Sequence, residues 1–342
     1  MIRDPRDRGG PAQPLLTVEN LRKHFPVRGT FLGRGVGRVQ AVDGVSFSVR
    51  KGETLGIVGE SGCGKSTTAR LLMRLIEPDG GAIVFDGETV GSRTGITVEA
   101  MRRQVQMVFQ DSYASLNPRM TIADSISYAP RMHGLPRKVA RERAEHLLGR
   151  VGLNPHIYAR RYPHELSGGQ RQRANIARAL ALQPRLVILD EAVSALDKSV
   201  EAQVLNLLAE LKESLNLTYL FISHDLNVVE YIADRVVVMY LGRVVETAPT
   251  EMIYRTPRHP YTRALFASKP TLDPDRRTTV MPLSGDPPNP INPPSGCRFR
   301  TRCAFAQAIC AETVPLVPGG GPEHRVACHL PQAQLATGVG HA

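Results

Sequence analysis

Short apolar runs and segments with helical spacing alternate along most of the chain. Runs typical of buried strands are TLGIVG at 54–59, LVILD at 186–190, TYLFIS at 218–223 and RVVVMYLGRVVE at 235–246. Residues 65–76 instead place their leucines at helical spacing, and a helical segment separates LVILD from TYLFIS. Strands that alternate with helices form a mostly parallel sheet covered on both faces. The pattern therefore predicts an α/β fold.

Three stretches depart from this alternation. Residues 15–58 predict short strands around a loop rich in Gly and Arg, and residues 101–173 are mostly helical between prolines. After about residue 265 the chain is rich in proline, holds four of its five cysteines and shows little helical period. We therefore divide the chain into a polar N-terminal tail at 1–14, a main domain at 15–265 and a small module at 266–342.

The balance of charge is basic, with 43 Lys and Arg against 32 Asp and Glu and a net charge of +11. This permits nucleic acid, anionic lipid or nucleotide as a partner, but the arginines are spread along the chain, which favours ordinary solvated helices. No run approaches the ~18–20 apolar residues that a spanning helix needs, and the polar start lacks the apolar core of a signal peptide. We expect a protein kept in the cytosol that reaches a membrane only through its surface or a partner.

The segment GESGCGKST fits the phosphate-loop pattern G-x-x-x-x-G-K-[ST] in full. It follows an apolar run and opens a predicted helix, which is the context that the pattern requires. Glycines let backbone N–H groups wrap round a phosphate, and the helix start adds positive potential. Lys65 is expected to reach the β- and γ-phosphates, and Ser66 to bind Mg²⁺. The predicted nucleotide-binding residues here are Gly59, Glu60, Ser61, Gly62, Cys63, Gly64, Lys65, Ser66 and Thr67.

Polar residues also follow three apolar runs, at the sheet edge where open α/β sheets bind ligands. Asp190 and Glu191 end LVILD: Asp190 is the candidate for the Mg²⁺ shell, and Glu191 can position or deprotonate the attacking water. His224 follows LFIS and can donate to a γ-phosphate, and Gln110 follows MVF and can bind Mg²⁺ or orient water. A lone histidine at a strand end is more often structural, and Gln110 by itself is also a weak signal.

A second helix start suited to an anion occurs in ELSGGQRQR, where a serine caps the helix and two glycines expose backbone N–H groups. The predicted binding residues of this start are Ser167, Gly168, Gly169 and Gln170. Together with GESGCGKST, FQD, LVILDE, SALD and SHD, LSGGQ makes residues 15–265 resemble the nucleotide-binding subunit of an ABC transporter. The resemblance implies an ABC ATPase cassette with a P-loop parallel-sheet core, an antiparallel β subdomain and a helical signature subdomain. One departure is Ala192, where the family usually has proline.

By this resemblance, the LSGGQ signature would not serve the ATP of its own chain. Two cassettes would meet head to tail, with each ATP between the phosphate loop of one and the signature of the other. Phe25 would stack on adenine, the segment Ser194–Asp197 would line the dimer seam, and Gln110 would sense the γ-phosphate where the cassette meets its membrane subunit. The presence of Glu191 implies hydrolysis, rather than a regulatory protein that holds ATP without turnover.

The tail narrows the class further. RHPYTRALFAS and INPPSGCRFRTRCAFAQAIC resemble the C-terminal module of ATPase subunits from oligopeptide and dipeptide permeases, and NPPSGC looks like the second of their two subunits. The resemblance implies a peripheral ATPase on the cytoplasmic side of the cell (inner) membrane that powers import of di- or oligopeptides. Its partners would be a second ATPase subunit in a heterodimer, two transmembrane permease subunits and, indirectly, an extracytoplasmic solute-binding protein, with no nucleic acid. A homodimer, an importer of nickel or another solute, and a nucleic-acid-linked ABC ATPase stay as alternatives.

Four cysteines, Cys297, Cys303, Cys310 and Cys328, lie in the tail with five, six and seventeen residues between them. Disulfides are not expected, because the cytosol keeps thiols reduced. Four thiolates suit Zn²⁺ or an iron–sulfur cluster, and the close C-x₂-C pairs of common zinc modules are absent from the sequence. The wide gaps favour the larger cluster, and the permease resemblance points to a [4Fe–4S] cluster with a structural role.

Overall fold

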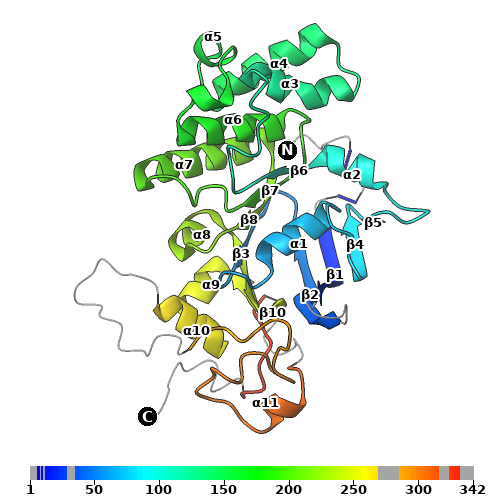
Figure 1. Ribbon diagram of the computed structural model, residues 1–342, viewed down its shortest axis with the longest axis vertical. Helices are drawn as coiled ribbons and strands as arrows, with labels where there is room; N and C mark the ends of the chain where they lie inside the picture. Colours follow the sequence, from blue (N-terminus) through cyan, green and yellow to red (C-terminus); the bar gives the residue numbers. More distant parts are fainter. Residues whose placement is uncertain are drawn as a thin grey trace. The chain divides into compact units, whose positions relative to one another are not determined.

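The computed structural model describes residues 6–7, 9–10, 12–28, 35–268, 285–315 and 323–331 (Figure 1). The chain forms two compact units that alternate along the sequence. The first comprises Met1–Leu16, Val49–Thr54 and Val84–Ser223, and the second comprises Thr17–Ser48, Leu55–Ile83 and His224–Ala342. The phosphate loop therefore shares a unit with the cysteine-containing tail, and the boundary predicted at residue 265 lies inside that second unit.

Parallel strands form the centre of the first unit. β6 (Val105–Val108), β7 (Leu186–Asp190) and β8 (Thr218–Ile222) pair in parallel, with Leu186 opposite both Val105 and Thr218. Every residue of β7 and β8 is buried, which is why both strands carry apolar residues at successive positions rather than at alternate ones. The strands predicted from LVILD and TYLFIS are confirmed.

Helices make up most of the rest of the first unit. They are α2 (Val98–Gln104), α3 (Ile122–Met132), α4 (Arg137–Arg150), α5 (Pro155–Tyr158), the 3-10 helix Pro163–Glu165, α6 (Gly168–Leu180) and α7 (Lys198–Leu215). α3, α4 and α6 pack against one another. Their starts follow local sequence signals: Thr121 caps α3 by accepting the N–H of Asp124 at 3.2 Å, and Pro136 directly precedes α4.

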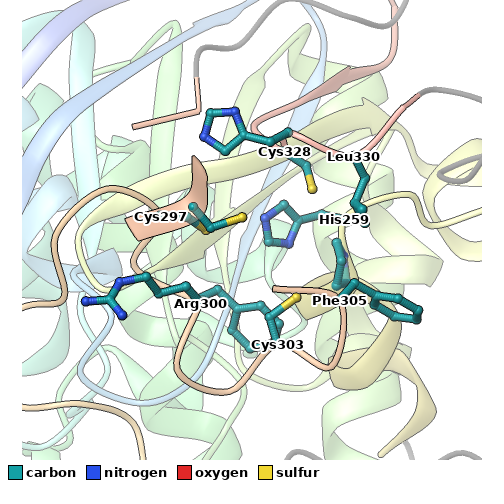
Figure 2. Close-up of a pocket in the computed structure, with 11 residues that line it drawn as sticks. His259, Cys297, Arg300, Cys303, Phe305, Cys328 and Leu330 are labelled. Carbon is teal, nitrogen blue, oxygen red and sulfur yellow. The ribbon is translucent and has the colours of Figure 1, made fainter. Parts of the chain in front are cut away.

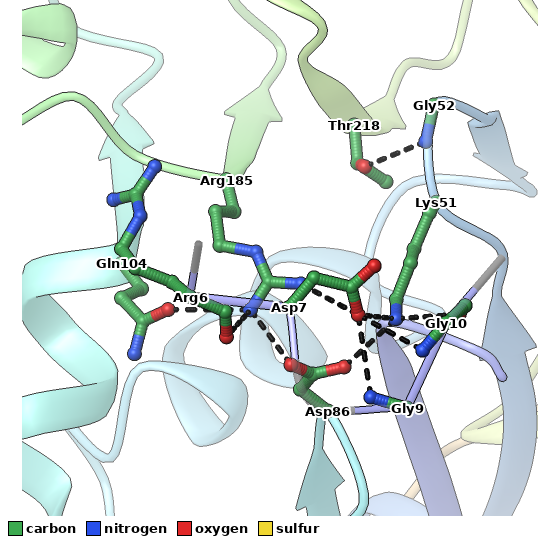
Figure 3. A network of polar contacts seen from close by, with 10 residues as sticks. All are labelled: Arg6, Asp7, Gly9, Gly10, Lys51, Gly52, Asp86, Gln104, Arg185 and Thr218. Atoms are coloured by element: carbon green, nitrogen blue, oxygen red, sulfur yellow. Dashed lines mark hydrogen bonds and ion pairs between the residues drawn. The ribbon is translucent and has the colours of Figure 1, made fainter. Parts of the chain in front are cut away.

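An ion network attaches the described N-terminal residues to the first unit (Figure 3). Buried Arg185 donates to Asp86 Oδ2 at 2.8 Å, and Lys51 Nζ lies 3.0 Å from Asp86 Oδ1. Lys51 also pairs with Asp7, whose Oδ1 accepts the N–H groups of residues 9 and 10. Because the two cations share carboxylates in a largely buried place, removing one member would leave an uncompensated charge.

The second unit is built around two sets of strands. β3 (Thr54–Val58) pairs in parallel with β9 (Arg235–Tyr240), β10 (Arg243–Pro249) runs antiparallel to β9, and β11 (Arg325–Val326) runs antiparallel to β10. β2 (Gly35–Val49), β1 (Leu16–Arg28) and β4 (Gly80–Phe85) lie side by side in that order; β4 ends in the first unit, where β5 (Glu88–Thr89) pairs antiparallel with its last residues. Its described helices are α1 (Lys65–Leu72), α8 (Leu226–Ile232), α9 (Thr250–Arg255), α10 (Pro260–Ala267) and α11 (Ile309–Glu312).

Two predicted elements end differently in the structure. The run at 235–246 folds as a hairpin of β9 and β10, because Leu241 and Gly242 adopt φ angles of 43° and 78°, the left-handed conformation of a tight turn. The helix predicted over 65–76 ends at Leu72, since Arg74 adopts a φ angle of 53°. Both differences come from residues in the left-handed backbone conformation, which the spacing of apolar residues does not reveal.

A buried carboxylate connects β10 to the C-terminal tail. Glu246 is 1% exposed and accepts the N–H groups of Arg258 at 2.8 Å and His259 at 2.9 Å, while His324 Nε2 lies 2.6 Å from its Oε1. Burial alone would raise the pKa of Glu246, but these hydrogen bonds outweigh it and hold the pKa below its ordinary value of 4.5. The charged carboxylate therefore stabilises this part of the fold.

The stabilising effect of Glu246 should depend on pH. Because its pKa is lower in the folded chain than in the unfolded chain, its contribution is complete at neutral pH and is lost as the pH falls below about 4.5 through the folded pKa. We expect Glu246→Gln to lower the free energy of unfolding by about 2–4 kcal/mol at neutral pH. The difference from the wild type should narrow as the pH falls below the ordinary carboxyl value.

Urea unfolding at a series of pH values checks this prediction. Glu251→Gln is the matched control, because the Glu251 side chain is 71% exposed and faces only a surface arginine. A difference between Glu246→Gln and the wild type that stayed constant with pH would contradict the prediction.

Candidate nucleotide-binding site

The phosphate loop at residues 59–67 connects β3 to α1 and packs directly against neighbouring backbone of the second unit. A Cβ on Gly64, where φ is 105°, would lie 2.2 Å from the carbonyl oxygen of Ala41. A Cβ on Gly59 would lie 2.2 Å from the carbonyl oxygen of Met239. Both positions therefore require glycine, and the shape of the loop is set by contacts that no side chain could share.

Lys65 lies inside this loop. Its side chain is 4% exposed, and Nζ donates to the carbonyl oxygens of Gly59 at 2.7 Å and Glu60 at 3.0 Å. The start of α1 carries no side-chain cap hydrogen bond, and the positive end of a helix dipole favours an anion there. Burial raises the pKa of the neighbouring Cys63 thiol, which keeps it protonated.

Two further candidates of the second unit lie nearer its surface. Phe25 in β1 is half-buried, and the ammonium group of Lys23 lies 5.6 Å from the centre of its ring. His224 is exposed and directly precedes Asp225, which caps α8 by accepting the N–H of Asn227 at 2.9 Å. Stacking of Phe25 on adenine and contact of His224 with a γ-phosphate stay predictions.

In the first unit, the structure brings two predicted catalytic residues together. Gln110 Nε2 donates to Glu191 Oε2 at 2.8 Å, although the two residues follow different strands. Asp190 is buried at the end of β7, and Glu191 directly after it has a φ angle of 49°. A left-handed glutamate costs on the order of 1–3 kcal/mol, a strain that persists where the surrounding structure imposes it, as at many functional sites.

Hydrogen bonds hold the Glu191 backbone in this conformation. Its N–H donates to the carbonyl oxygen of Ile222 at 2.9 Å, and its own carbonyl oxygen accepts from the N–H and the hydroxyl of Ser194. Ala192, which stands where the resembling family has proline, is buried. The turn is therefore fixed by its partners without the proline.

The LSGGQ segment begins α6, as its pattern predicted. Ser167 caps the helix by accepting the N–H of Gln170 at 3.4 Å, and Gln170 Oε1 accepts the N–H of Ser167 at 3.0 Å. The two glycines differ in their surroundings. A Cβ on Gly169 would lie 2.4 Å from Val200 of α7, whereas the nearest atom to a Cβ on Gly168 is on Leu196 at 3.8 Å. Packing within the chain therefore requires glycine at 169 but not at 168.

Residues that the sequence analysis did not identify tie α6 to the segment that follows Gln110. Asn175 Nδ2 donates to the carbonyl oxygen of Ser112 at 2.9 Å, and Arg178 donates to that of Ser115. The guanidinium group of Arg171 lies 5.7 Å from the ring centre of Tyr113. A buried asparagine within an amphipathic helix was the one available signal, and it does not specify a partner.

The four cysteines of the tail line one pocket of the second unit (Figure 2). Its other residues include His259, Phe299, Phe305 and Leu330. The sulfur atoms of Cys297, Cys303 and Cys328 point toward the middle of this pocket, whereas the guanidinium group of Arg300 points away from it. All four are free thiols in the structure. We call this space the cysteine pocket.

The cysteine pocket disfavours charge. Burial, together with the neighbouring thiols Cys328, Cys297 and Cys310, raises the pKa of Cys303 to about 11. His259 is buried, which lowers its pKa to about 4 and keeps the ring neutral, with Nδ1 accepting the N–H of Tyr261 at 3.0 Å. Among the described residues, no three His, Cys, Asp or Glu side chains lie close enough together to hold a single metal ion.

Two residues near the tail contact the phosphate loop and were not identified from the sequence. Arg302 forms two hydrogen bonds with the carboxylate of Glu60, and the Tyr261 hydroxyl accepts the N–H of Glu60 at 2.9 Å. Each lies more than two hundred positions from the loop. No local pattern predicts such contacts.

Comparison with known families matches two parts of the chain. The family described as ABC transporter matches residues 42–194, and the family described as oligopeptide/dipeptide transporter, C-terminal region, matches residues 245–310. No helix in the described part of the chain is both long and apolar enough to cross a membrane.

Known proteins resemble the chain over nearly its whole length. The oligopeptide transport ATP-binding protein AppF of Bacillus subtilis is 51% identical over 93% of this chain and 98% of its own length. A probable peptide ABC transporter ATP-binding protein of Sinorhizobium fredii is 52% identical over 92% of this chain and 90% of its own. The solved structure of cbiO1 from Clostridium perfringens, part of the ABC transporter complex cbiONQ, aligns with a TM-score of 0.60 and 29% identity over 71% of this chain and 91% of that one.

Proposed function

Because this chain belongs to the family of ABC transporter ATP-binding proteins that carry the oligopeptide/dipeptide transporter C-terminal region, we propose that it hydrolyses ATP to power the import of peptides. One observation carries the proposal: a complete phosphate loop lies within a chain that is 51% identical, almost end to end, to an oligopeptide transport ATP-binding protein. ATP-driven import is the shared activity of these relatives. Nickel or another solute is the alternative cargo, since the resemblance of the tail extends to importers of such solutes.

In this proposal the second unit holds the phosphates. The loop N–H groups and Lys65 bind the β- and γ-phosphates, because the ammonium group already lies among loop carbonyls that fix its position. Ser66 would hold Mg²⁺ together with Asp190 of the first unit, and the ion would neutralise phosphate charge. Phe25 would stack on the base, and His224 would donate to the γ-phosphate.

The first unit supplies the group that acts on water. Glu191 orients or deprotonates the attacking water, and Gln110, which donates to the same carboxylate, reports the presence of the γ-phosphate. The hydrogen bond supports this pairing of roles, because a change at one residue alters the orientation of the other. The fixed backbone at Glu191 supports a positioned base rather than a solvated surface acid.

The signature start of α6 would bind the ATP of a second ATPase subunit. Ser167 is exposed, and the chain's own packing leaves space at Gly168, which supports a role for this edge outside its own chain. The residues Ser194–Asp197 would lie at the same dimer seam. In a dimer, each of two ATP molecules would then contact the phosphate loop of one subunit and the signature of the other. ATP therefore favours the closed dimer over the open one, and hydrolysis allows the dimer to open.

The assembly we propose is a heterodimer with a related ATPase subunit, bound to two transmembrane permease subunits on the cytoplasmic side of the membrane. A solute-binding protein would deliver peptide from the other side. The names of the relatives, which are transport ATP-binding proteins for peptides, support the permease partners. The choice of a heterodimer rests on the resemblance of the NPPSGC segment to the second of two paired subunits.

Substitutions of Lys65 and Glu191 should impair different steps, ATP binding and ATP hydrolysis respectively. Lys65→Ala should abolish ATP binding, since the phosphates lose their main counter-charge. Glu191→Gln should bind ATP with nearly wild-type affinity but lower hydrolysis at least about 100-fold in the assembled transporter, because the shape survives without the carboxylate. Nucleotide binding by calorimetry and phosphate release check both variants. Wild-type hydrolysis by Glu191→Gln would refute its assigned role.

Gly168 offers a test of the signature in trans. Gly168→Ala adds a methyl group that meets only Leu196 at an ordinary contact distance, so folding and ATP affinity of the isolated subunit should be unchanged. ATP-dependent dimerisation, followed by light scattering in a Glu191→Gln background, should weaken about ten-fold or more. Gly169→Ala is the contrast, because it collides with Val200 inside the chain and should lower stability. Loss of ATP binding by the isolated Gly168→Ala subunit would place the signature in cis.

We also propose that the cysteine pocket holds a [4Fe–4S] cluster with a structural role. Four thiols border the described pocket together with aromatic and aliphatic residues, and four thiolates are the donor set that such a cluster takes. Zn²⁺ stays the alternative metal, because four thiolates also suit it. The wide gaps between the cysteines in the sequence and the resemblance of the tail to the permease module support the cluster, with thiolates of Cys297, Cys303, Cys310 and Cys328 as ligands.

Metal analysis tests this cofactor. Protein purified without oxygen should be brown and contain about four irons and four sulfides per chain, with the colour lost in Cys303→Ser. Cys63→Ser is the control, since Cys63 lies in the phosphate loop away from these thiols in sequence and should leave the iron content unchanged. Colourless protein with one zinc per chain would replace the cluster by a zinc site.

A further inference from the structure

The segment Cys297–Cys303, with the sequence CRFRTRC, joins the cysteine pocket to the phosphate loop. Its two terminal cysteines line the pocket, whereas its arginines at 298 and 302 contact residues at or next to the loop. Residues that line the cysteine pocket and residues that contact the loop region therefore lie within the same seven successive positions. A short segment of this kind cannot move at one end without moving the other.

Arg302 makes the direct contact with the loop. Its Nη1 donates to Glu60 Oε2 at 2.8 Å and its Nη2 to Oε1 at 3.0 Å, a bidentate pair between side chains that are 6% and 22% exposed. The guanidinium group also lies 5.9 Å from the ring centre of Tyr240. Charge-assisted, two-point hydrogen bonds are strong and directional, so Arg302 fixes both the position and the orientation of the Glu60 carboxylate.

Aromatic packing also helps to position Glu60, the residue whose carboxylate Arg302 holds. Phe299 contacts the rings of Tyr240 and Tyr261 edge-on, with centroid distances of 5.3 Å and 5.4 Å. The Tyr261 hydroxyl accepts the backbone N–H of Glu60 at 2.9 Å. Glu60 is thus held through both its backbone and its side chain, and its carbonyl oxygen is one of the two that receive the Lys65 ammonium group.

Arg298 supplies a second connection to the same region. Its guanidinium group donates to Asp43, to Gln40 and to the carbonyl oxygen of Leu241. The next residue, Gly242, donates its N–H to the carbonyl oxygen of Cys63 in the phosphate loop at 2.8 Å. The segment therefore reaches the loop by one direct route through Arg302 and one indirect route through the β9–β10 turn.

We propose that Arg302 is a positioning residue of the phosphate loop, and that through it the binding of a metal centre by the cysteine pocket raises the affinity of the chain for ATP. The inference rests on the proposed function. When Cys303 is ligated, the backbone next to Arg302 is fixed, so the guanidinium group is held ready for Glu60. Without the metal centre the segment Cys297–Cys303 is more mobile, and the phosphate loop adopts its ATP-binding conformation less often. Part of the free energy of ATP binding is then needed to order the loop, so the apparent affinity for ATP is lower.

ATP binding by arginine variants of the full chain tests the positioning role. Arg302→Ala should weaken ATP binding about ten-fold, measured by calorimetry, and Arg302→Lys should fall between it and the wild type because it keeps only one contact. Arg300→Ala is the matched control: Arg300 donates to the carbonyl oxygen and hydroxyl of Ser295 within the tail and should leave ATP affinity unchanged. In the assembled transporter Arg302→Ala should raise KM for ATP while leaving kcat near the wild-type value.

A merely structural role would lower kcat and stability together, without selective loss of ATP affinity, and would contradict the proposal. If Arg302→Ala does not fold, Arg302→Lys and Glu60→Gln carry the test. Arg302→Lys should add little further weakening in a Glu60→Gln background, because both changes remove the same contact. Additive effects of the two changes would overturn the assignment.

The link to the cysteine pocket has its own double-mutant cycle. Cys303→Ser should weaken ATP binding about three-fold or more when Arg302 is present, and have no further effect in Arg302→Lys or Arg302→Ala. Equal weakening in both backgrounds, or none in either, would sink the coupling. The proposed function is judged separately, by whether the wild type binds ATP and Lys65→Ala does not.

Discussion

The close approach of the phosphate loop to neighbouring backbone is the constraint on which the second unit depends. Space at Gly59 and Gly64 is filled by the carbonyl oxygens of Met239 and Ala41, which lie where any Cβ would be. β9 must therefore end at a fixed place, and it does so through the tight turn at Leu241–Gly242, whose N–H reaches the loop again. β10, which begins after this turn, carries Glu246 and through it the fold of the tail. Loop, turn and tail are parts of one packed arrangement.

This arrangement changes how the tail is understood. Its composition suggests an appendage, since it is rich in proline and cysteine and has little regular structure. In the described residues, however, buried Arg298 and half-buried Arg302 bind residues at or next to the phosphate loop, and Phe299 packs against the rings of Tyr240 and Tyr261. A buried bidentate ion pair is maintained only where its geometry is well defined. The tail therefore belongs to the nucleotide-binding half of the molecule.

In the first unit, a set of hydrogen bonds holds the Glu191 carboxylate on a backbone in a strained conformation. Glu191 is left-handed, yet its backbone makes hydrogen bonds to Ile222 and Ser194 and its side chain accepts from Gln110. The segment after Gln110 is in turn fastened to α6 by Asn175 and Arg178. The helix that begins with the signature thus also supports the residue that donates to Glu191, so the two motifs are connected by packing rather than by sequence.

The sequence by itself determined the elements whose signals are local. The successive apolar residues of LVILD and TYLFIS specify buried parallel strands, GESGCGKST specifies a loop whose glycines leave room for backbone, and Ser167 specifies a helix start. Local patterns did not specify where the run at 235–246 would turn or that α1 would end at Leu72, because single left-handed residues decide both. Only the tertiary structure decided which glycine of the signature is packed within the chain, that Gln110 meets Glu191, that the four cysteines share a pocket, and that Arg302 holds Glu60. Each of these contacts joins residues far apart in the sequence. Such contacts depend on how whole elements pack, and the spacing of side chains along the chain does not specify that packing.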